Sequence, residues 1–152
     1  MKIRILMFED ESSILRPICT FLRAQGYEVL GFNTPKACPL LSDINHECPH
    51  DQACADILIT DMKMPGMTGY ELIRTMAGKG CGIPLHNVIV ISSTMAPEQR
   101  EEIASFGGHF LPKPFQLGAL LRVIRDCNNN ILPSRKLIPI EILSTSARPL
   151  SS

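Results

Sequence analysis

The stretch Ala55 to Gly69, which reads ADILITDMKMPGMTG, decides the fold of this chain. Its first part, Ile57 to Thr60, is a short apolar run rich in β-branched residues, which is typical of a strand buried on both faces of a parallel sheet. Asp61 follows at the carboxyl end of this strand, and Pro65 with Gly66 indicates a turn. In open α/β sheets the ligand crevice lies just outside the carboxyl ends of the strands. Asp61 is therefore a candidate for chemistry, and the alternative is a solvated aspartate that simply ends a strand.

Strand-like apolar runs alternate with helix-like segments on both sides of this stretch. The predicted strands are Ile3 to Phe8, Tyr27 to Phe32, Ile57 to Thr60, Val88 to Ile91, and Phe110 to Leu111. The predicted helices run from a Ser12 or Ser13 cap to Ala24, from Pro35 to Ile44, from a Thr68 cap through Tyr70 to Met76, from Ala96 to Phe106, and from Gln116 to Cys127. The alternation predicts an α/β fold, a doubly wound parallel sheet of five strands flanked by five helices.

Length and charge narrow the function further. The chain has 152 residues, which suits one domain with a substantial core. Its 15 basic and 15 acidic residues balance, so we expect no nucleic-acid or membrane-surface partner. No apolar run approaches the length of a membrane helix, and the amino terminus lacks a signal-peptide pattern. We therefore expect a cytoplasmic protein whose six cysteines are thiols.

Polar residues follow four of the predicted strands and should meet at one edge of the sheet. Glu9 and Asp10 follow the first strand, Asp61 the third, Ser92 the fourth and Lys113 the fifth. Two carboxylates at about 4 Å repel by roughly 4 kcal/mol at an effective dielectric constant near 20. A divalent cation removes this conflict, and an all-oxygen site suits Mg²⁺. The hydroxyl and the ammonium could then bind the oxygens of a phosphoryl group on Asp61.

The chain resembles a receiver domain of two-component response regulators, with a flavodoxin-like fold. The matching motifs are FEDE, ITDMKMPGMTG, VIVISS and FLPKPF, which occur in this order between Ile3 and about Cys127. The resemblance implies that Asp61 accepts a phosphoryl group from a histidine kinase or a phosphorelay. It also implies that the receiver covers residues 1–128.

The resemblance assigns roles to the other residues of the edge. It implies that Asp10 ligates Mg²⁺ directly, that Glu9 acts through water, and that the backbone carbonyl of Lys63 is a third protein ligand beside Asp61. Ser92 and Lys113 would contact the phosphoryl oxygens, and Phe110 would be the aromatic switch residue. The Lys113-Pro114 peptide is expected to be cis.

The chain departs from the family pattern at three places. Glu9 replaces the more common aspartate and reaches further. Phe110 lacks the hydroxyl of the tyrosine often found there, so its switching would depend on packing. The segment between the second and third strands is longer than usual.

Because the residues after the last helix are too few for an output domain, we expect a single-domain response regulator that signals by contact with a downstream protein. A phosphorylation-dependent homodimer is possible. No enzymatic activity is expected beyond phosphorylation and dephosphorylation of its own aspartate. The main alternative is a degenerate receiver that binds partners without phosphorylation, but none of the acids, the hydroxyl or the lysine is missing. A phosphoaspartate hydrolase of the haloacid dehalogenase type is disfavoured because Lys63 occupies the position of its second acid.

Residues 129–152 are expected to form a tail without an output domain, because so few residues cannot build one. The apolar residues between Leu137 and Leu143 suggest an extended strand or a docking arm, and Ser144 to Ser152 is expected to be mobile.

Five potential zinc ligands lie in or beside the long segment before the third strand: Cys38, His46, Cys48, His50 and Cys54. Their spacing contains no CxxC pair, so we expect an unliganded or redox-labile loop and no structural metal.

Overall fold

The computed structural model of the chain describes residues 1–38 and 47–146. They contain a sheet of five strands in the order β2-β1-β3-β4-β5, and every neighbouring pair is parallel. The strands are β1 Arg4–Phe8, β2 Glu28–Phe32, β3 Ile57–Asp61, β4 Val88–Ser92 and β5 His109–Pro112. The predicted doubly wound parallel sheet is confirmed.

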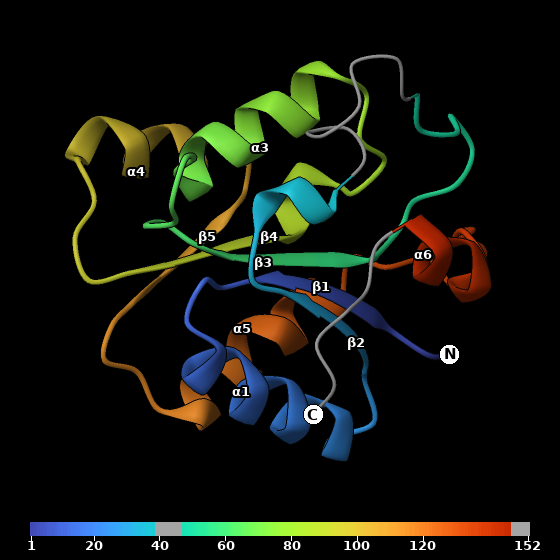
Figure 1. Cartoon of the computed structure of the whole chain (residues 1–152), viewed down its shortest axis with the longest axis horizontal. Coiled ribbons are helices and arrows are strands. Elements are labelled where there is room, and N and C mark those ends of the chain that lie inside the picture. Colours follow the sequence, from blue (N-terminus) through green and yellow to red (C-terminus); the bar gives the residue numbers. More distant parts are fainter. Residues whose placement is uncertain (39–46, 147–152) are drawn as a thin grey trace.

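Helices cover both faces of this sheet (Figure 1). Helices α1 (Ser12–Ala24) and α5 (Leu117–Asn128) lie on one face, and α3 (Gly69–Gly78) and α4 (Pro97–Ser105) lie on the other. Two short 3₁₀ helices, η1 (Pro35–Ala37) and η2 (Leu85–Asn87), and a last helix, α6 (Ile140–Ser146), complete the elements of the described residues. No helix among these elements is long and apolar enough to span a bilayer.

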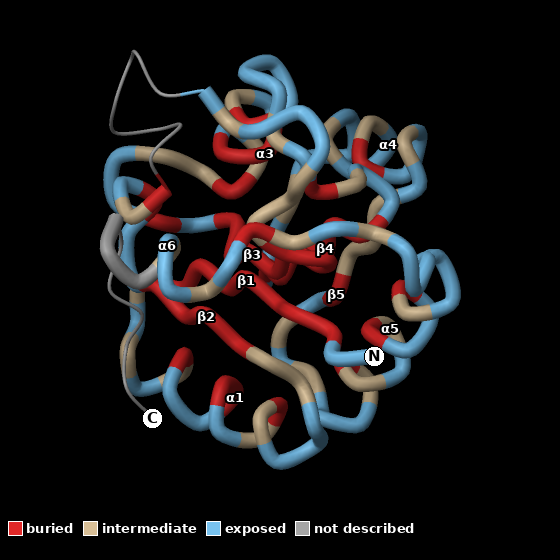
Figure 2. Tube along the Cα trace, turned by 90° about the vertical axis from the view of Figure 1, so that its right-hand side faces the viewer, coloured by how far each residue is buried: buried red, intermediate tan, exposed pale blue. Residues whose placement is uncertain are grey.

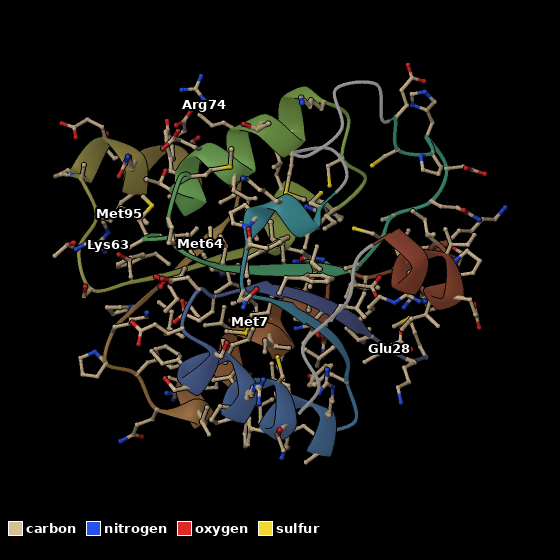
Figure 3. All side chains as sticks on the ribbon, in the orientation of Figure 1. Met7, Glu28, Lys63, Met64, Arg74 and Met95 are labelled. Atoms are coloured by element: carbon tan, nitrogen blue, oxygen red, sulfur yellow. The ribbon has the colours of Figure 1, made fainter. Side chains whose placement is uncertain are left out.

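Strands β1, β3 and β4 are buried along their whole length and β2 along all but its first residue, as the unbroken apolar runs predicted (Figure 2). The edge strand β5 is buried only at Leu111. Successive side chains of β1 enter opposite halves of the core: Leu6 and Phe8 join the half beside α3, whereas Ile5 and Met7 join the half beside α1 and α5. Figure 3 shows this separation, with Met7 on the α1 and α5 side and Met64 and Met95 on the α3 and α4 side.

The two predicted helix caps have different outcomes. Thr68 caps α3 as expected, because its hydroxyl accepts from the backbone N–H of Glu71 at 3.1 Å while Glu71 Oε1 accepts from the backbone N–H of Thr68 at 3.3 Å. The prediction of Ser12 or Ser13 as the cap of α1 is wrong. Glu11 occupies that position and makes no side-chain cap bond. Its backbone carbonyl accepts from the N–H of Leu15 at 2.9 Å and so starts the helix one residue earlier.

The second predicted helix, Pro35 to Ile44, is described only at its start. There the chain forms η1, with the Thr34 hydroxyl accepting from the backbone N–H of Lys36 at 3.3 Å. Residues 39–44 lie outside the described residues.

The segment after α5 packs back onto the domain, and the expectation of an extended arm is wrong for its second half. Leu137 forms a single parallel bridge with Ala53, but the chain then turns into α6 at Ile140. Ile140 and Leu143 are three residues apart, share a helix face and pack against the core beside α3. Of the stretch expected to be mobile, residues 144–146 belong to α6, and residues 147–152 lie outside the described part.

Candidate functional site

The polar residues predicted to meet do so at the carboxyl edge of the sheet. Glu9 and Asp10 directly follow β1, Asp61 and Ser92 are the last residues of β3 and β4, and Lys113 directly follows β5. The strand order brings these ends together, because β3 lies between β1 and β4. Helix α6 lies at the other end of the sheet (Figure 1).

Three carboxylates form the centre of the site. One oxygen from each of Glu9, Asp10 and Asp61 lies within 4.8 Å of the other two. Glu9 and Asp61 are only 2% and 8% exposed, whereas Asp10 is half-buried. The site therefore holds two acids that water reaches poorly, beside one that remains accessible.

Lys113 supplies the positive charge of the site. Its Nζ lies 3.1 Å from Oδ2 of Asp61 and 3.3 Å from Oε1 of Glu9, forming an ion pair with each carboxylate. The backbone N–H of Lys113 donates to the carbonyl of Ser92 at 2.9 Å, which fixes the start of the side chain beside β4. The Lys113-Pro114 peptide is cis, as predicted.

The site shifts the protonation of two of its groups. The pKa of Glu9 is raised to about 8, first by burial and then by the neighbouring Asp61 carboxylate, although Lys113 opposes this shift. Partial burial acts to lower the pKa of Lys113. Its hydrogen bond to Asp61 and the charges of Glu9 and Asp61 outweigh burial, so the pKa of Lys113 is raised. A proton on Glu9 relieves part of the repulsion that a cation would also relieve.

The donor set fits a hard divalent cation. Oε2 of Glu9 is buried and has no hydrogen-bond partner among the described residues. The three clustered side chains offer only oxygen ligands, which Mg²⁺ prefers over nitrogen or sulfur. The half-buried position of Asp10 leaves room for the water molecules that Mg²⁺ usually retains.

Two further predicted residues lie next to this centre. Lys63 is in the loop that leaves β3, and its side chain is exposed, so only its backbone carbonyl suits the predicted ligand role (Figure 3). Ser92 is 1% exposed, and its hydroxyl is hydrogen-bonded to the backbone of Thr94, accepting from the N–H at 3.1 Å and donating to the carbonyl. The Ser92 hydroxyl is thus engaged with the β4–α4 loop.

Phe110 lies on β5 opposite Val90 and is half-buried. The guanidinium carbon of Arg100, on α4, lies 4.5 Å from the centre of the Phe110 ring, which is a cation–π contact. The sequence reasoning missed Arg100, because α4 is mostly polar and no motif distinguishes one of its charged residues from the others. A positive charge on the helix before an aromatic switch position was the available signal.

Gly69 is a second residue that the sequence reasoning missed as part of the site. It begins α3, and its backbone N–H donates to the carbonyl of Met62 at 2.8 Å. A Cβ atom at this position would lie 2.3 Å from the carbonyl oxygen of Asp61, so only glycine fits without movement of the backbone. Gly69 therefore fixes how closely α3 approaches the end of β3.

Residues 5–125 match the family model described as response regulator receiver domain. The response regulator MprA of Mycobacterium tuberculosis is 25% identical over 126 residues, which are 82% of this chain and 50% of MprA. The two-component response regulator PhoP of Pseudomonas aeruginosa is 28% identical over 127 residues, covering 78% of this chain and 52% of PhoP. The chain thus spans about half the length of these curated relatives.

Solved structures share the fold. The non-phosphorylated receiver domain of HemR from Leptospira biflexa superposes with a TM-score of 0.68 at 22% sequence identity, covering 87% of this chain and 98% of that domain. At this identity the likeness concerns the fold alone.

Proposed function

The chain belongs to the response regulator receiver domain family, and on this premise we propose that Asp61 accepts a phosphoryl group in a Mg²⁺-dependent reaction. The donor is a histidine kinase or a phosphotransfer protein. In the transfer, the bond between phosphorus and the donor's imidazole nitrogen breaks, and a bond from phosphorus to an Asp61 carboxylate oxygen forms. The product is an acyl phosphate on the domain's own aspartate.

The observation that carries this proposal is the position of Lys113 Nζ, 3.1 Å from Asp61 Oδ2. An ammonium at hydrogen-bond distance from the acceptor oxygen can bind a phosphoryl oxygen once the carboxylate is phosphorylated. Ser92, at the end of the neighbouring strand, can supply a second donor when its hydroxyl turns away from Thr94.

Glu9, Asp10, Asp61 and the carbonyl of Lys63 would hold Mg²⁺, with Glu9 acting through water. The bound ion supplies positive charge that neutralises the acidic cluster and the incoming phosphoryl oxygens. Because the pKa of Glu9 is raised, its side chain must release a proton before the carboxylate can bind a water ligand of Mg²⁺.

The domain acts on no second substrate in this proposal: its chemistry is phosphorylation and dephosphorylation of Asp61. The signal passes by protein contact through the face formed by α4, β5 and α5, where Phe110 lies. The same face is where a phosphorylation-dependent homodimer would form.

The experiment uses acetyl phosphate as a small donor, with and without Mg²⁺, and intact-mass measurement as the readout. The chain should gain one acid-labile phosphoryl group only when Mg²⁺ is present. Asp61→Asn should gain none, and Asp10→Ala should be strongly impaired. Asp126→Asn, which changes an exposed acid of α5, is the matched control and should behave as the unchanged protein. A phosphoryl group that persists in Asp61→Asn would refute the assignment.

A further inference from the structure

Four of the six cysteines gather at one place in the fold, although they come from three separate segments. We name this group the thiol cluster: it consists of Cys38, Cys48, Cys54 and Cys81. Cys38 is buried in the core half beside α3, and the other three are partly buried and pack against that core. Cys54 interacts electrostatically with each of the other three thiols. The sequence pattern pointed to the segment before β3 but missed Cys81, which follows α3.

Within the thiol cluster, Cys54 and Cys81 interact most strongly: a hydrogen bond between their side chains is the largest influence on the pKa of both thiols. Their backbones also approach closely. A Cβ atom added to Gly82 would lie 3.1 Å from the carbonyl oxygen of Gln52 and 3.2 Å from Cα of Ala53. The absence of a side chain at Gly82 therefore lets the segment after α3 lie directly against the segment before β3.

Backbone hydrogen bonds hold both partners in place. The N–H of Cys81 donates to the carbonyl of Met76 at 2.9 Å, which ties it to the end of α3. Ala53, next to Cys54, donates to the carbonyl of Lys136 at 3.1 Å and accepts from the N–H of Ile138 at 2.8 Å. Both thiols therefore lie on anchored segments that pack against each other.

The two thiols differ in the way that a reactive pair requires. The hydrogen bond from Cys54 lowers the pKa of Cys81 to about 7, with help from a backbone hydrogen bond at Ile83, although burial opposes the shift. The shift favours the thiolate of Cys81, and the thiolate is the nucleophilic form. The same contact, together with burial, raises the pKa of Cys54, which remains a protonated donor.

The remaining two cysteines provide an internal contrast. Cys19 and Cys127 are buried in the core half beside α1 and α5, and burial raises the pKa of both thiols, that of Cys127 to about 12. Buried thiols of this kind are inert toward oxidants.

We propose that Cys54 and Cys81 form an oxidisable dithiol, which a small hydroperoxide converts into an intramolecular disulfide. The Cys81 thiolate attacks one peroxide oxygen, the O–O bond breaks, and the departing oxygen leaves as an alcohol, or as water from hydrogen peroxide, after taking up a proton. Cys54 then attacks the sulfur of the resulting sulfenic acid: the S–S bond forms, the S–O bond breaks, and the hydroxide leaves with the Cys54 proton as water. Two thiols are oxidised and one peroxide is reduced.

The geometry favours this reaction over a zinc site. Among residues 1–38 and 47–146, Glu9, Asp10 and Asp61 form the one group of three His, Cys, Asp or Glu side chains whose ligand atoms lie within 4.8 Å of one another. A tetrahedral zinc site with sulfurs about 2.3 Å from the metal requires closer mutual spacing than that. The thiol cluster contains one interacting pair, Cys54 and Cys81, with two thiols as neighbours, which suits S–S bond formation.

The disulfide would join the segment before β3 to the end of α3 and leave the carboxyl edge of the sheet unchanged. The proposal is therefore independent of phosphorylation, and Asp61→Asn should form the disulfide at the unchanged rate.

The test treats the full chain, reduced and freed of reductant, with hydrogen peroxide, then blocks remaining thiols and maps peptides by mass spectrometry. One linked pair containing Cys54 and Cys81 is expected, and the rate should rise with pH through about 7, as titration of the Cys81 thiol requires. Cys54→Ser should stop at a sulfenic acid that dimedone traps. Cys81→Ser should lose the rapid reaction with hydrogen peroxide. Cys127→Ser is the matched control and should react at the rate of the unchanged chain.

Peptide mapping of the unchanged chain identifies the linked cysteines even if a variant fails to fold. A disulfide that instead involves Cys48 or Cys38, or oxidation no faster than that of the denatured chain, would overturn the proposal. Stoichiometric zinc in protein purified without added metal, released when the thiol cluster is alkylated, would also overturn it in favour of a metal site.

Discussion

The guanidinium of Arg100 lies over the ring of Phe110, with 4.5 Å between its central carbon and the ring centre. Arg100 belongs to α4 and Phe110 to β5, so the contact joins the two elements at the face proposed for output. Phe110 has no hydroxyl, so its ring cannot be held by a hydrogen bond of its own. The cation–π contact with Arg100 instead holds the ring in its half-buried position. We expect phosphorylation to move the Phe110 ring inward, and this movement must break the contact.

Replacing Arg100 by methionine should therefore favour the inward position of Phe110. A cation–π contact at an exposed site contributes about 0.5–1 kcal/mol, so the inward population should rise by roughly two- to fivefold without phosphorylation. Fluorine NMR of fluorophenylalanine-labelled protein measures this population. Arg16→Met, which changes an exposed arginine of α1, is the control. Identical Phe110 signals in Arg100→Met and the control would contradict the role of Arg100.

Lys113 should couple phosphorylation to the conformational change. Lys113→Ala removes the ammonium 3.1 Å from Asp61 but leaves the carboxylate itself intact. Asp61 should still be labelled by acetyl phosphate, more slowly than in the unchanged chain, while the Phe110 signal should no longer respond to labelling. A normal response of Phe110 in phosphorylated Lys113→Ala would show that the coupling passes through other residues.

Glu9 should make stability depend on pH when Mg²⁺ is removed. Its pKa is raised from 4.5 to about 8 in the folded chain, so the folded state retains a proton that the unfolded state releases. The stabilisation that the Glu9 proton gives to the folded state is fully present below about pH 4.5 and is lost as pH rises through about 8. Over this range the free energy of unfolding should fall by at most about 1.4 kcal/mol per pH unit.

Urea unfolding in EDTA at several pH values between these limits measures the effect. In Glu9→Gln the free energy of unfolding should fall less with rising pH. Glu11→Gln changes an exposed neighbouring acid and should keep the full pH dependence. An unchanged pH dependence in Glu9→Gln would assign the proton to another group.

Gly69 should tolerate no side chain. Gly69→Ala places Cβ 2.3 Å from the Asp61 carbonyl oxygen, so the backbone must shift at a cost of about 1–3 kcal/mol in the free energy of unfolding. Labelling of Asp61 should fall with it, because the acceptor end of β3 moves. Gly118→Ala is the matched control: nothing lies within 4 Å of its added Cβ, and it should be neutral or stabilising by up to about 1 kcal/mol. Equal stability and equal labelling of the two variants would disprove the close approach.

Arg135 should stabilise the domain without affecting its chemistry. Its Nε and Nη2 lie 2.7 and 2.8 Å from the carboxylate oxygens of Asp56, which is buried at the amino end of β3. Because the Arg135 side chain is partly exposed, Arg135→Ala should lower the free energy of unfolding by only about 1–2 kcal/mol. Lys136→Ala, at an exposed neighbouring position, should change little. If both variants unfold alike in urea, the ion pair contributes nothing to stability.

The sequence predicted best where one local signal decides the outcome. The β-branched run before Asp61 could hardly be anything other than a buried strand, and Thr68 with Glu71 forms a capping pair within four residues. Parallel strands then bring Asp61 and Lys113 together, although 52 positions separate them.

The sequence failed where tertiary contacts decide. Leu137 to Leu143 alternates like a strand, but the chain turns into α6 after the buried Ile138. Ile140 and Leu143 then pack against the core from one face of the helix, and Ile142 remains 57% exposed. Cys81 showed no pattern linking it to Cys54, because their contact depends on the backbone packing that Gly82 allows. Arg4 interrupts an apolar run, but it donates to the carbonyl of Ile138 at 2.7 Å, a partner that no local rule could identify.

That last contact bears on the order of folding events. Arg4 and Ile138 are 134 positions apart, and the hydrogen bond from Arg135 Nη2 to the carbonyl of Lys2, at 2.7 Å, spans 133. Closing such long loops costs chain entropy, so we expect these contacts to form late, after β1 and β3 have paired. Interactions absent from the transition state change the unfolding rate constant and leave the folding rate constant almost unaltered. We therefore expect the segment after α5 to slow the unfolding of the sheet while leaving its rate of folding almost unchanged.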